Sequence, residues 1–342
     1  MKLTTEKNHT ISAIRMICTL AVVLLHIFQQ YEKNIPKLHI GTDWLNLGLV
    51  MFFSISAFLY AGRNISGPGK WLYKRFRELL VPSLLVGIFT LVVFFATGHK
   101  DLSRIGVTLI SCLGFQVWCK DSWLFVQLWF LSYILFCYIT IPLVQKIPCK
   151  NCSNVKFWGV LIGAVIVAQV LVFLLESILH ITLLSVGMLL RFYLPYFLLR
   201  RYNIHDKRLQ KTMCVLSIFG ILALVVTCLC RYTSLFPLPD ALKELVFIYT
   251  QTLVGTICFY WLYQLLSHIQ ISLSVLKISD MYSYPIYLTH CLFIGYSTSV
   301  IRAYNYTIFS VLLALLLTAV SSITIQKISQ FLLRKRTQYT SA

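Results

Sequence analysis

The stretch that decides the fold is Ile14–His26, with the sequence IRMICTLAVVLLH, in which an arginine and a histidine stand at the two ends of an apolar run. Leu, Val and Ile partition favourably into hydrocarbon, so the run itself predicts a membrane-spanning helix. A permanent cation and a titratable base are costly in the same environment. Their presence on one membrane helix therefore calls for a specific reason.

The composition extends this prediction to the whole chain. Its 342 residues are 58% hydrophobic and only 12% charged, with a mean hydropathy of +0.78, whereas soluble domains are about one quarter charged. We therefore expect an all-α, polytopic membrane helix bundle surrounded by lipid. The 30 Lys and Arg outnumber the 11 Asp and Glu, but they lie in short clusters between apolar runs, which is typical of orientation signals. A nucleic-acid partner is not expected.

About ten apolar segments are long enough to span a membrane, which takes roughly 20 residues. They lie near 11–29, 44–61, 79–97, 123–145, 157–175, 182–199, 213–230, 246–266, 283–300 and 306–327. The segment 105–118 is apolar but short, which fits an interfacial or re-entrant piece. The first run lacks a small-residue cleavage site, so we expect it to stay as an anchor. The prediction is one membrane domain over 1–342, ending in a short basic tail at 331–342.

Charges in the loops predict the orientation of this bundle. The clusters of Lys and Arg alternate with nearly balanced loops. The second loop is predicted to hold Arg63, Lys70, Lys74, Arg75 and Arg77. The other basic clusters are Lys2 and Lys7; Lys146, Lys150 and Lys156; Arg200, Arg201, Lys207, Arg208 and Lys211; and Lys327, Arg334, Lys335 and Arg336. Because cytoplasmic loops carry the excess of Lys and Arg, both termini are predicted to be cytoplasmic. The eighth loop, with Lys277 against Asp280, is uninformative.

Arg15 and His26 are expected to share one face of the first span. At 100° per residue, eleven residues bring them to within about 20° of each other around the helix and about 16 Å apart along it. Arg15 then lies near the cytoplasmic end and His26 towards the outer half. Such a face predicts a polar interface or a cavity. The alternative is that Arg15 reaches the lipid headgroups and His26 only packs.

Two later spans carry polar residues at membrane depth. Arg191 lies near the middle of span six, where an arginine needs a partner inside the bundle. Span nine reads YSYPIYLTH, and Ser283, Tyr287 and His290 fall on one stripe of it. That stripe fits either a substrate-facing surface or a hydrogen-bonded seam between helices.

The remaining candidates are basic and cysteine residues. Arg75 and Arg77 could clamp phosphates of a cytoplasmic anion, since guanidinium groups match phosphate geometry, or could only set the topology. Cys149 and Cys152 form an isolated C-x-x-C pair with no second pair to complete a zinc site, so no metal is expected.

Several segments together resemble the acyltransferase type 3 family of integral-membrane O-acyltransferases. Arg15 followed by His26 is similar to the opening of that family. The other similar segments, in family order, are GLVMFFSISAFLYAGR (Gly48–Arg63), KRFRELLVP (Lys74–Pro82), LWFLSYILFCYITIP (Leu128–Pro142), RFYLPYFLLRRY (Arg191–Tyr202) and YSYPIYLTHCLF (Tyr282–Phe293). The resemblance covers the whole chain. Ala57 and Arg200 depart from it, each standing where glycine is expected.

The resemblance implies transfer of an acyl group, most often acetyl, from cytoplasmic acyl-coenzyme A to a hydroxyl of a surface glycan or its lipid-linked precursor. It implies His26 as the general base, since a neutral imidazole suits proton abstraction near neutral pH. Arg15, Arg75 and Arg77 would hold the anionic donor. The enzyme would lie in the plasma membrane and use acetyl-CoA as donor substrate, with no bound cofactor and no metal.

Arg191 or a tyrosine of span nine would stabilise the oxyanion. Tyr287 and His290 would line the pore or the acceptor side. A transporter is the alternative function, because polar residues in a ten-span bundle also suit a substrate pathway. It predicts an internal repeat, and none is visible in the sequence. A second alternative is a structural or sensory membrane protein whose buried polar groups only join helices.

Overall fold

The computed structural model describes residues 5–32, 34–35, 37–96, 103–119, 127–150, 152–180, 182–233, 236–295 and 299–339. Within these ranges the chain forms helices joined by loops and no β-strand, as the sequence predicted. The chain divides into two compact units. Unit 1 comprises Met1–Ile14, Leu47–Ile65 and Ile139–Ile271, and unit 2 comprises Arg15–Asn46, Ser66–Tyr138 and Ser272–Ala342.

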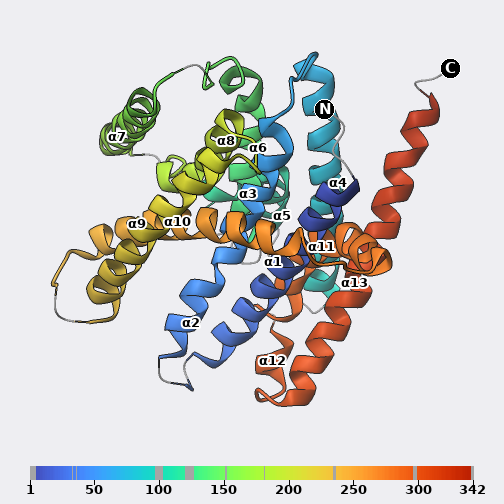
Figure 1. The fold of residues 1–342 in the computed structure, drawn as a ribbon. Helices are drawn as coiled ribbons and strands as arrows, with labels where there is room; N and C mark the ends of the chain where they lie inside the picture. Colours follow the sequence, from blue (N-terminus) through green and yellow to red (C-terminus); the bar gives the residue numbers. More distant parts are fainter. Residues whose placement is uncertain are drawn as a thin grey trace. The chain divides into compact units, whose positions relative to one another are not determined.

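Unit 1 is built on three helices that pack against one another, α3 (Leu47–Ala61), α8 (Val186–Arg201) and α10 (Asp240–Leu266). The helix α9 (Lys207–Tyr232) lies along α10 (Figure 1). At the α3–α10 crossing, a Cβ on Gly255 would lie 2.4 Å from Val50 Cγ1. Glycine is needed there because only a residue without a side chain lets the two helices approach so closely.

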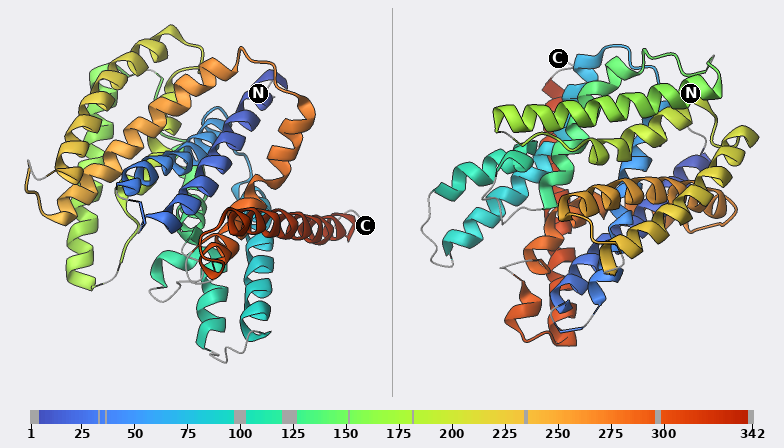
Figure 2. Two further views of the ribbon diagram at one scale, coloured as in Figure 1. Left: turned by 90° about the horizontal axis from the view of Figure 1, so that it is seen from below. Right: turned by 90° about the vertical axis from the view of Figure 1, so that its left-hand side faces the viewer.

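The outer helix of unit 1 is α7 (Asn154–Leu179), which touches α8 (Figure 2). None of its 18-residue apolar window is buried inside the protein, as expected for a helix whose surface faces lipid. It begins where the Ser153 hydroxyl accepts the Lys156 N–H at 3.2 Å, an N-cap that satisfies one of the helix's open donors.

Unit 2 is organised by α11 (Leu273–Phe293) and α13 (Ile308–Tyr339), which pack together and against α4 (Pro68–Ala96). Its other elements are α1 (Thr5–Tyr31) beyond Ile14, α2 (Leu38–Leu45), α5 (Ser103–Ile110), η1 (Ser111–Phe115), η2 (Gln116–Trp118), most of α6 (Trp129–Val144) and α12 (Val300–Ala303). A small apolar cluster joins α1 to the end of α11 and to α13 through Val23, Ile27, Ile294 and Ala314.

Seven helices among the described residues are long and apolar enough to cross a membrane. The three other predicted spans also have helical counterparts, in α6, α8 and α11. Two of these have 16 residues each, and α11 carries the polar residues of its YSYPIYLTH stretch. The count of ten spans and the sidedness of the termini remain predictions.

Three predicted boundaries differ from the structure. The residues from Lys70 to Arg77 belong to the first turns of α4, which begins at Pro68, and not to a loop. Proline at the start of a helix costs nothing because its missing N–H would have no partner there. The helix α13 runs to Tyr339, so the predicted tail at 331–342 is helical through that residue. The span predicted at 283–300 corresponds to a helix that ends earlier, at Phe293.

The short segment predicted at 105–118 is a broken helix. It passes from α5 into the π-helical η1 and then the 3₁₀ turn η2. Gly114 has φ 92°, a left-handed conformation that favours glycine, and a Cβ there would lie 2.4 Å from Leu135 Cδ1. The segment packs on α4, where a Cβ on Gly87 would lie 2.5 Å from Cys112 Sγ. Its depth in the membrane remains a prediction.

Candidate active site

Two pairs of polar side chains join α1 to α11 in unit 2. Arg15 forms an ion pair with Asp280. Further along both helices, the imidazole rings of His26 and His290 face each other with their centroids 5.0 Å apart. The pairs are eleven residues apart on α1 and ten on α11, each a rise of about 15–16 Å. The shared face expected of Arg15 and His26 is thus the face that contacts α11.

The order of these contacts shows that α1 and α11 run in the same direction. Parallel spans require an odd number of membrane crossings between them. The predicted spans two to eight supply an odd number, so the α1–α11 pairing agrees with the predicted topology.

Hydrogen bonds define which nitrogen of each imidazole carries the proton. His26 Nδ1 lies 2.8 Å from Gln29 Oε1, and His290 Nδ1 lies 3.0 Å from the Ile286 carbonyl oxygen. An amide or carbonyl oxygen accepts a hydrogen bond and cannot donate one, so each Nδ1 is the donor. In the neutral rings, Nε2 then holds the lone pair that can take up a proton.

The two histidines differ in their surroundings. His290 is fully buried, and its Nε2 lies 3.2 Å from the Cys291 thiol. His26 is only partly buried. A general base must reach the proton it removes, so His26 is the better placed of the two for an incoming hydroxyl group.

Tyr287 lies beside His290 on α11. Its ring centroid lies 6.0 Å from that of His290. Its hydroxyl donates to the Gln127 carbonyl oxygen, and Phe130 packs edge-on against its ring at 5.4 Å. This stripe of α11 is therefore a hydrogen-bonded helix–helix seam, one of the two alternatives left open by the sequence. Its role on the acceptor side remains a prediction.

His26, His290 and Cys291 could together hold a metal ion, since their donor atoms all lie within 4.8 Å of one another. Two imidazoles and a thiolate are ligands that zinc accepts, with a fourth position open for water. A thiolate would first have to replace the thiol that now contacts His290 Nε2. This set was not identified from the sequence, in which Cys291 looked like an ordinary apolar position.

The predicted donor-binding arginines lie on α4, also in unit 2. Arg75 forms an ion pair with Glu78 at 2.6 Å, and Arg77 donates to the Leu333 carbonyl oxygen of α13. Both guanidinium groups are partly exposed. The Arg77 contact fixes the basic end of α4 against α13, and phosphate binding by either arginine remains a prediction.

Arg191 lies in unit 1 and is completely buried. Its Nη2 donates to Gln251 Oε1 of α10 at 2.8 Å, which confirms the expectation of a partner inside the bundle. The predicted role of Arg191 at an oxyanion remains a prediction.

The C-x-x-C pair also lies in unit 1. Both thiols are free of disulfide bonds, and Arg201 Nη1 lies 2.9 Å from Cys152 Sγ. Burial raises the pKa of the Cys149 thiol, which disfavours the thiolate that a metal ligand requires.

Sequence reasoning missed three residues that support the site, Asp280, Gln29 and Gln127. Asp280 was counted as a loop charge, yet it lies inside α11 and pairs with Arg15. Its spacing of ten residues from His290, close to the eleven of Arg15 and His26, was the available signal. Gln29 follows His26 by three residues, which places it on a neighbouring position of the same helix.

The fold and the site together define a multi-pass helical membrane protein with two histidines that face each other between two helices. The family model described as an acyltransferase domain matches residues 8–326. The chain therefore belongs to the acyltransferase type 3 family and is a membrane acyltransferase. No curated protein and no solved structure matches it.

Proposed function

We propose that this protein is an O-acyltransferase of the plasma membrane, which moves an acetyl group from cytoplasmic acetyl-CoA to a hydroxyl of a cell-surface glycan or its lipid-linked precursor. The observation that carries the proposal is the His26–His290 pair, held in register by Arg15 and Asp280. The hydrogen bond from His26 Nδ1 to Gln29 Oε1 supports it, because it leaves the lone pair of the neutral ring on Nε2.

His26 Nε2 takes the proton of the acceptor hydroxyl as its oxygen attacks the thioester carbonyl. The carbon–oxygen bond of the new ester forms, the tetrahedral intermediate collapses, and the carbon–sulfur bond breaks. His26 then returns the proton to the departing thiolate, so that free CoA leaves as a thiol. The chemistry needs no redox partner and no metal ion.

The other site residues serve the two ends of this reaction. Arg75, Arg77 and Arg15 bind donor phosphates at the cytoplasmic end, where guanidinium groups form paired hydrogen bonds to phosphate oxygens. Tyr287 stabilises the oxyanion, and Arg191 is the alternative that its variants test. His290 and Tyr287 shape the acceptor side.

The test uses His26→Gln, with His268→Gln as the control because His268 is an exposed histidine outside the site. Gln keeps a hydrogen-bonding side chain of similar size but cannot shuttle a proton. We expect acyl-CoA consumption by the purified protein, with an acceptor glycan extract present, to fall about 10²–10⁴-fold in His26→Gln. The folded amount and the His268→Gln activity should be unchanged.

Mass spectrometry of the surface glycans should show the same pattern in cells. Loss of an ester-linked acyl group in cells without the gene, not restored by His26→Gln, supports the proposal. An active, folded His26→Gln enzyme contradicts the assignment and moves the base to His290. Loss of whole sugar units with acyl groups retained would favour the transporter. Inhibition by a zinc chelator, reversed by added zinc, would instead favour a metal at His26, His290 and Cys291.

A further inference from the structure

A large basic cavity lies in unit 1, and none of the residues assigned above to the reaction lines it. Its volume is about 1260 Å³, and it opens at one end of the unit, where the segments after α3, α6 and α8 come together. Its charged lining consists of Arg63, Lys146, Lys150, Arg200, Arg201 and Arg208 against one acid, Asp206. The loop charges predict that all three segments are cytoplasmic.

Two of the cations serve as a scaffold for the cavity wall. Arg201 donates at 2.8 Å to the carbonyl oxygens of Cys149 and Cys152 and to Asn154 Oδ1. Its guanidinium also lies 4.8 Å from the centre of the Phe157 ring. Arg200 donates to the Gln145 carbonyl oxygen and, at 3.2 Å, to Tyr196. These bonds hold the segment between α6 and α7 against the end of α8.

A second set of bonds fixes other lining segments. The side-chain amide of Gln145 accepts the Ile65 N–H at 3.0 Å and donates to the Ile65 carbonyl oxygen at 3.3 Å. The segment after α3 is thereby tied to the end of α6. Gln264 donates to the Ile204 carbonyl oxygen at 2.9 Å, which anchors the segment after α8. The cavity is therefore preorganised, which lowers the entropic cost of binding a ligand.

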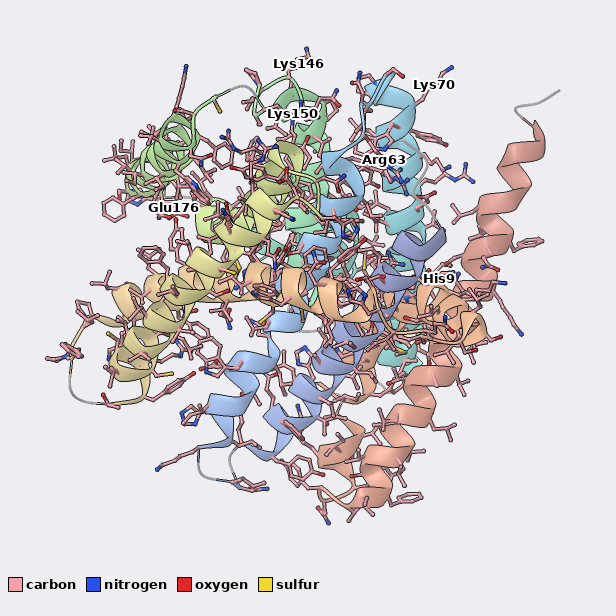
Figure 3. All side chains as sticks on the ribbon, in the orientation of Figure 1. His9, Arg63, Lys70, Lys146, Lys150 and Glu176 are labelled. Atoms are coloured by element: carbon pink, nitrogen blue, oxygen red, sulfur yellow. The ribbon has the colours of Figure 1, made fainter. Side chains whose placement is uncertain are left out.

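The charges that remain for a ligand are on Arg63, Lys146 and Lys150, which are all exposed (Figure 3). The one acid cannot balance them, because Asp206 is engaged by Arg208 at 3.0 Å. Those hydrogen bonds hold the pKa of Asp206 below its usual value, so it stays charged and paired. Phe58, Tyr202 and Ile204 supply an apolar surface in the same cavity.

We infer that this cavity binds a phosphate-bearing ligand whose phosphate lies beside an apolar or planar group. Three exposed cations line the one cavity, and amino and guanidinium groups bind phosphate oxygens through charge-assisted hydrogen bonds. The cavity is larger than a single phosphate needs, and pockets of this size hold ligands as large as nucleotides or lipid headgroups. Such a phosphate comes either from a soluble diphosphate or from an anionic lipid headgroup. The site does not depend on the proposed acyl transfer, because its binding is measured without turnover.

The experiment compares two triple variants of the full-length protein in nanodiscs. The cavity variant carries Arg63→Gln, Lys146→Gln and Lys150→Gln. The matched control carries Lys211→Gln, Lys277→Gln and Lys327→Gln, which remove the same charge from exposed residues outside the cavity. One arm measures binding of inorganic pyrophosphate to protein in phosphatidylcholine nanodiscs. The other counts phosphatidylglycerol molecules retained by the protein, by native mass spectrometry.

We expect the cavity variant to bind at least about tenfold more weakly than the wild type in one arm, and the control variant to stay within about twofold. Loss in the pyrophosphate arm assigns a soluble diphosphate, and loss in the phosphatidylglycerol arm assigns a lipid headgroup. Equal behaviour of the two triple variants in both arms overturns the inference, as does the absence of wild-type binding in both. The substituted side chains are exposed, and thermal unfolding of each variant verifies that it is folded.

Discussion

Two regions of the molecule bury polar side chains between apolar helices, and they use different chemistry. In unit 1, Arg191 donates to Gln251, and both side chains are at least 99% buried. In unit 2, His26 and His290 face each other across α1 and α11. A guanidinium group stays protonated at all physiological pH values, whereas a neutral imidazole can take up a proton and release it.

The surroundings of Arg191 are those of a helix seam. Thr227 and Thr250 share a hydrogen bond of 2.7 Å between α9 and α10, and Thr252 donates to the Gly187 carbonyl oxygen of α8 at 3.1 Å. Side-chain hydrogen bonds of this kind join membrane helices. A polar residue at membrane depth is therefore not enough to indicate chemistry. The comparison favours Arg191 as a structural residue and His26 as the reactive one.

The largest effect on stability is expected at Arg191, and it tests whether this arginine is structural. Gln251→Leu removes a hydrogen bond from a buried charged group, which costs about 1.5–3 kcal/mol. The double variant Arg191→Met with Gln251→Leu replaces both polar groups with apolar ones, so most of the lost stability should return. Thermal unfolding in detergent measures both, with Thr227→Val as a control for a lost neutral hydrogen bond.

Activity of the double variant decides the role of Arg191. A structural Arg191 predicts that the stable double variant retains its acyl-CoA consumption. A double variant that is folded but inactive would contradict the comparison, because it would give Arg191 the oxyanion role expected from the family resemblance.

The sequence predicted the helices better than it predicted their partners. The spacing of Arg15 and His26 predicted a shared face, because residues eleven apart return to the same side of a helix. It could not predict Asp280 as the partner of Arg15, because 265 residues separate them. The basic cavity could not be predicted from the sequence either. Its cations, such as Arg63 and Lys150, belong to different loops of the sequence. Only tertiary packing brings them into one cavity.

A smaller effect is expected at the Arg15–Asp280 ion pair, whose side chains are 24% and 42% exposed. Ion pairs that are open to solvent contribute about 0.2–1 kcal/mol to stability, so Asp280→Asn should lower activity only a few-fold. Arg15→Gln should cost more, about tenfold, because it also removes a donor-binding guanidinium. The measurement is acyl-CoA consumption as a function of donor concentration.

The exchanged pair, Arg15→Asp with Asp280→Arg, separates the two roles of Arg15. It restores opposite charges across α1 and α11 and should recover the stability lost in the single variants, while the KM for the donor stays raised. Full recovery of donor affinity in the exchanged pair would mean that Arg15 only sets the register of the helices.

The smallest effect concerns Gln29, which holds the tautomer of His26 through its 2.8 Å contact with Nδ1. A hydrogen bond contributes about 0.5–1.5 kcal/mol, so Gln29→Leu should lower kcat by about 2- to 12-fold and leave the KM for the donor unchanged. Gln29→Glu keeps an acceptor oxygen within reach of Nδ1 and should restore most of the activity.

His290 provides the comparison within the same pair, because its Nδ1 is held by the Ile286 backbone carbonyl, which no side-chain substitution removes. If Gln29→Leu and Gln29→Glu lose activity equally, the tautomer of His26 does not limit the rate. The distinction between a reactive histidine and a structural arginine would then rest on His26→Gln and on the Arg191 double variant.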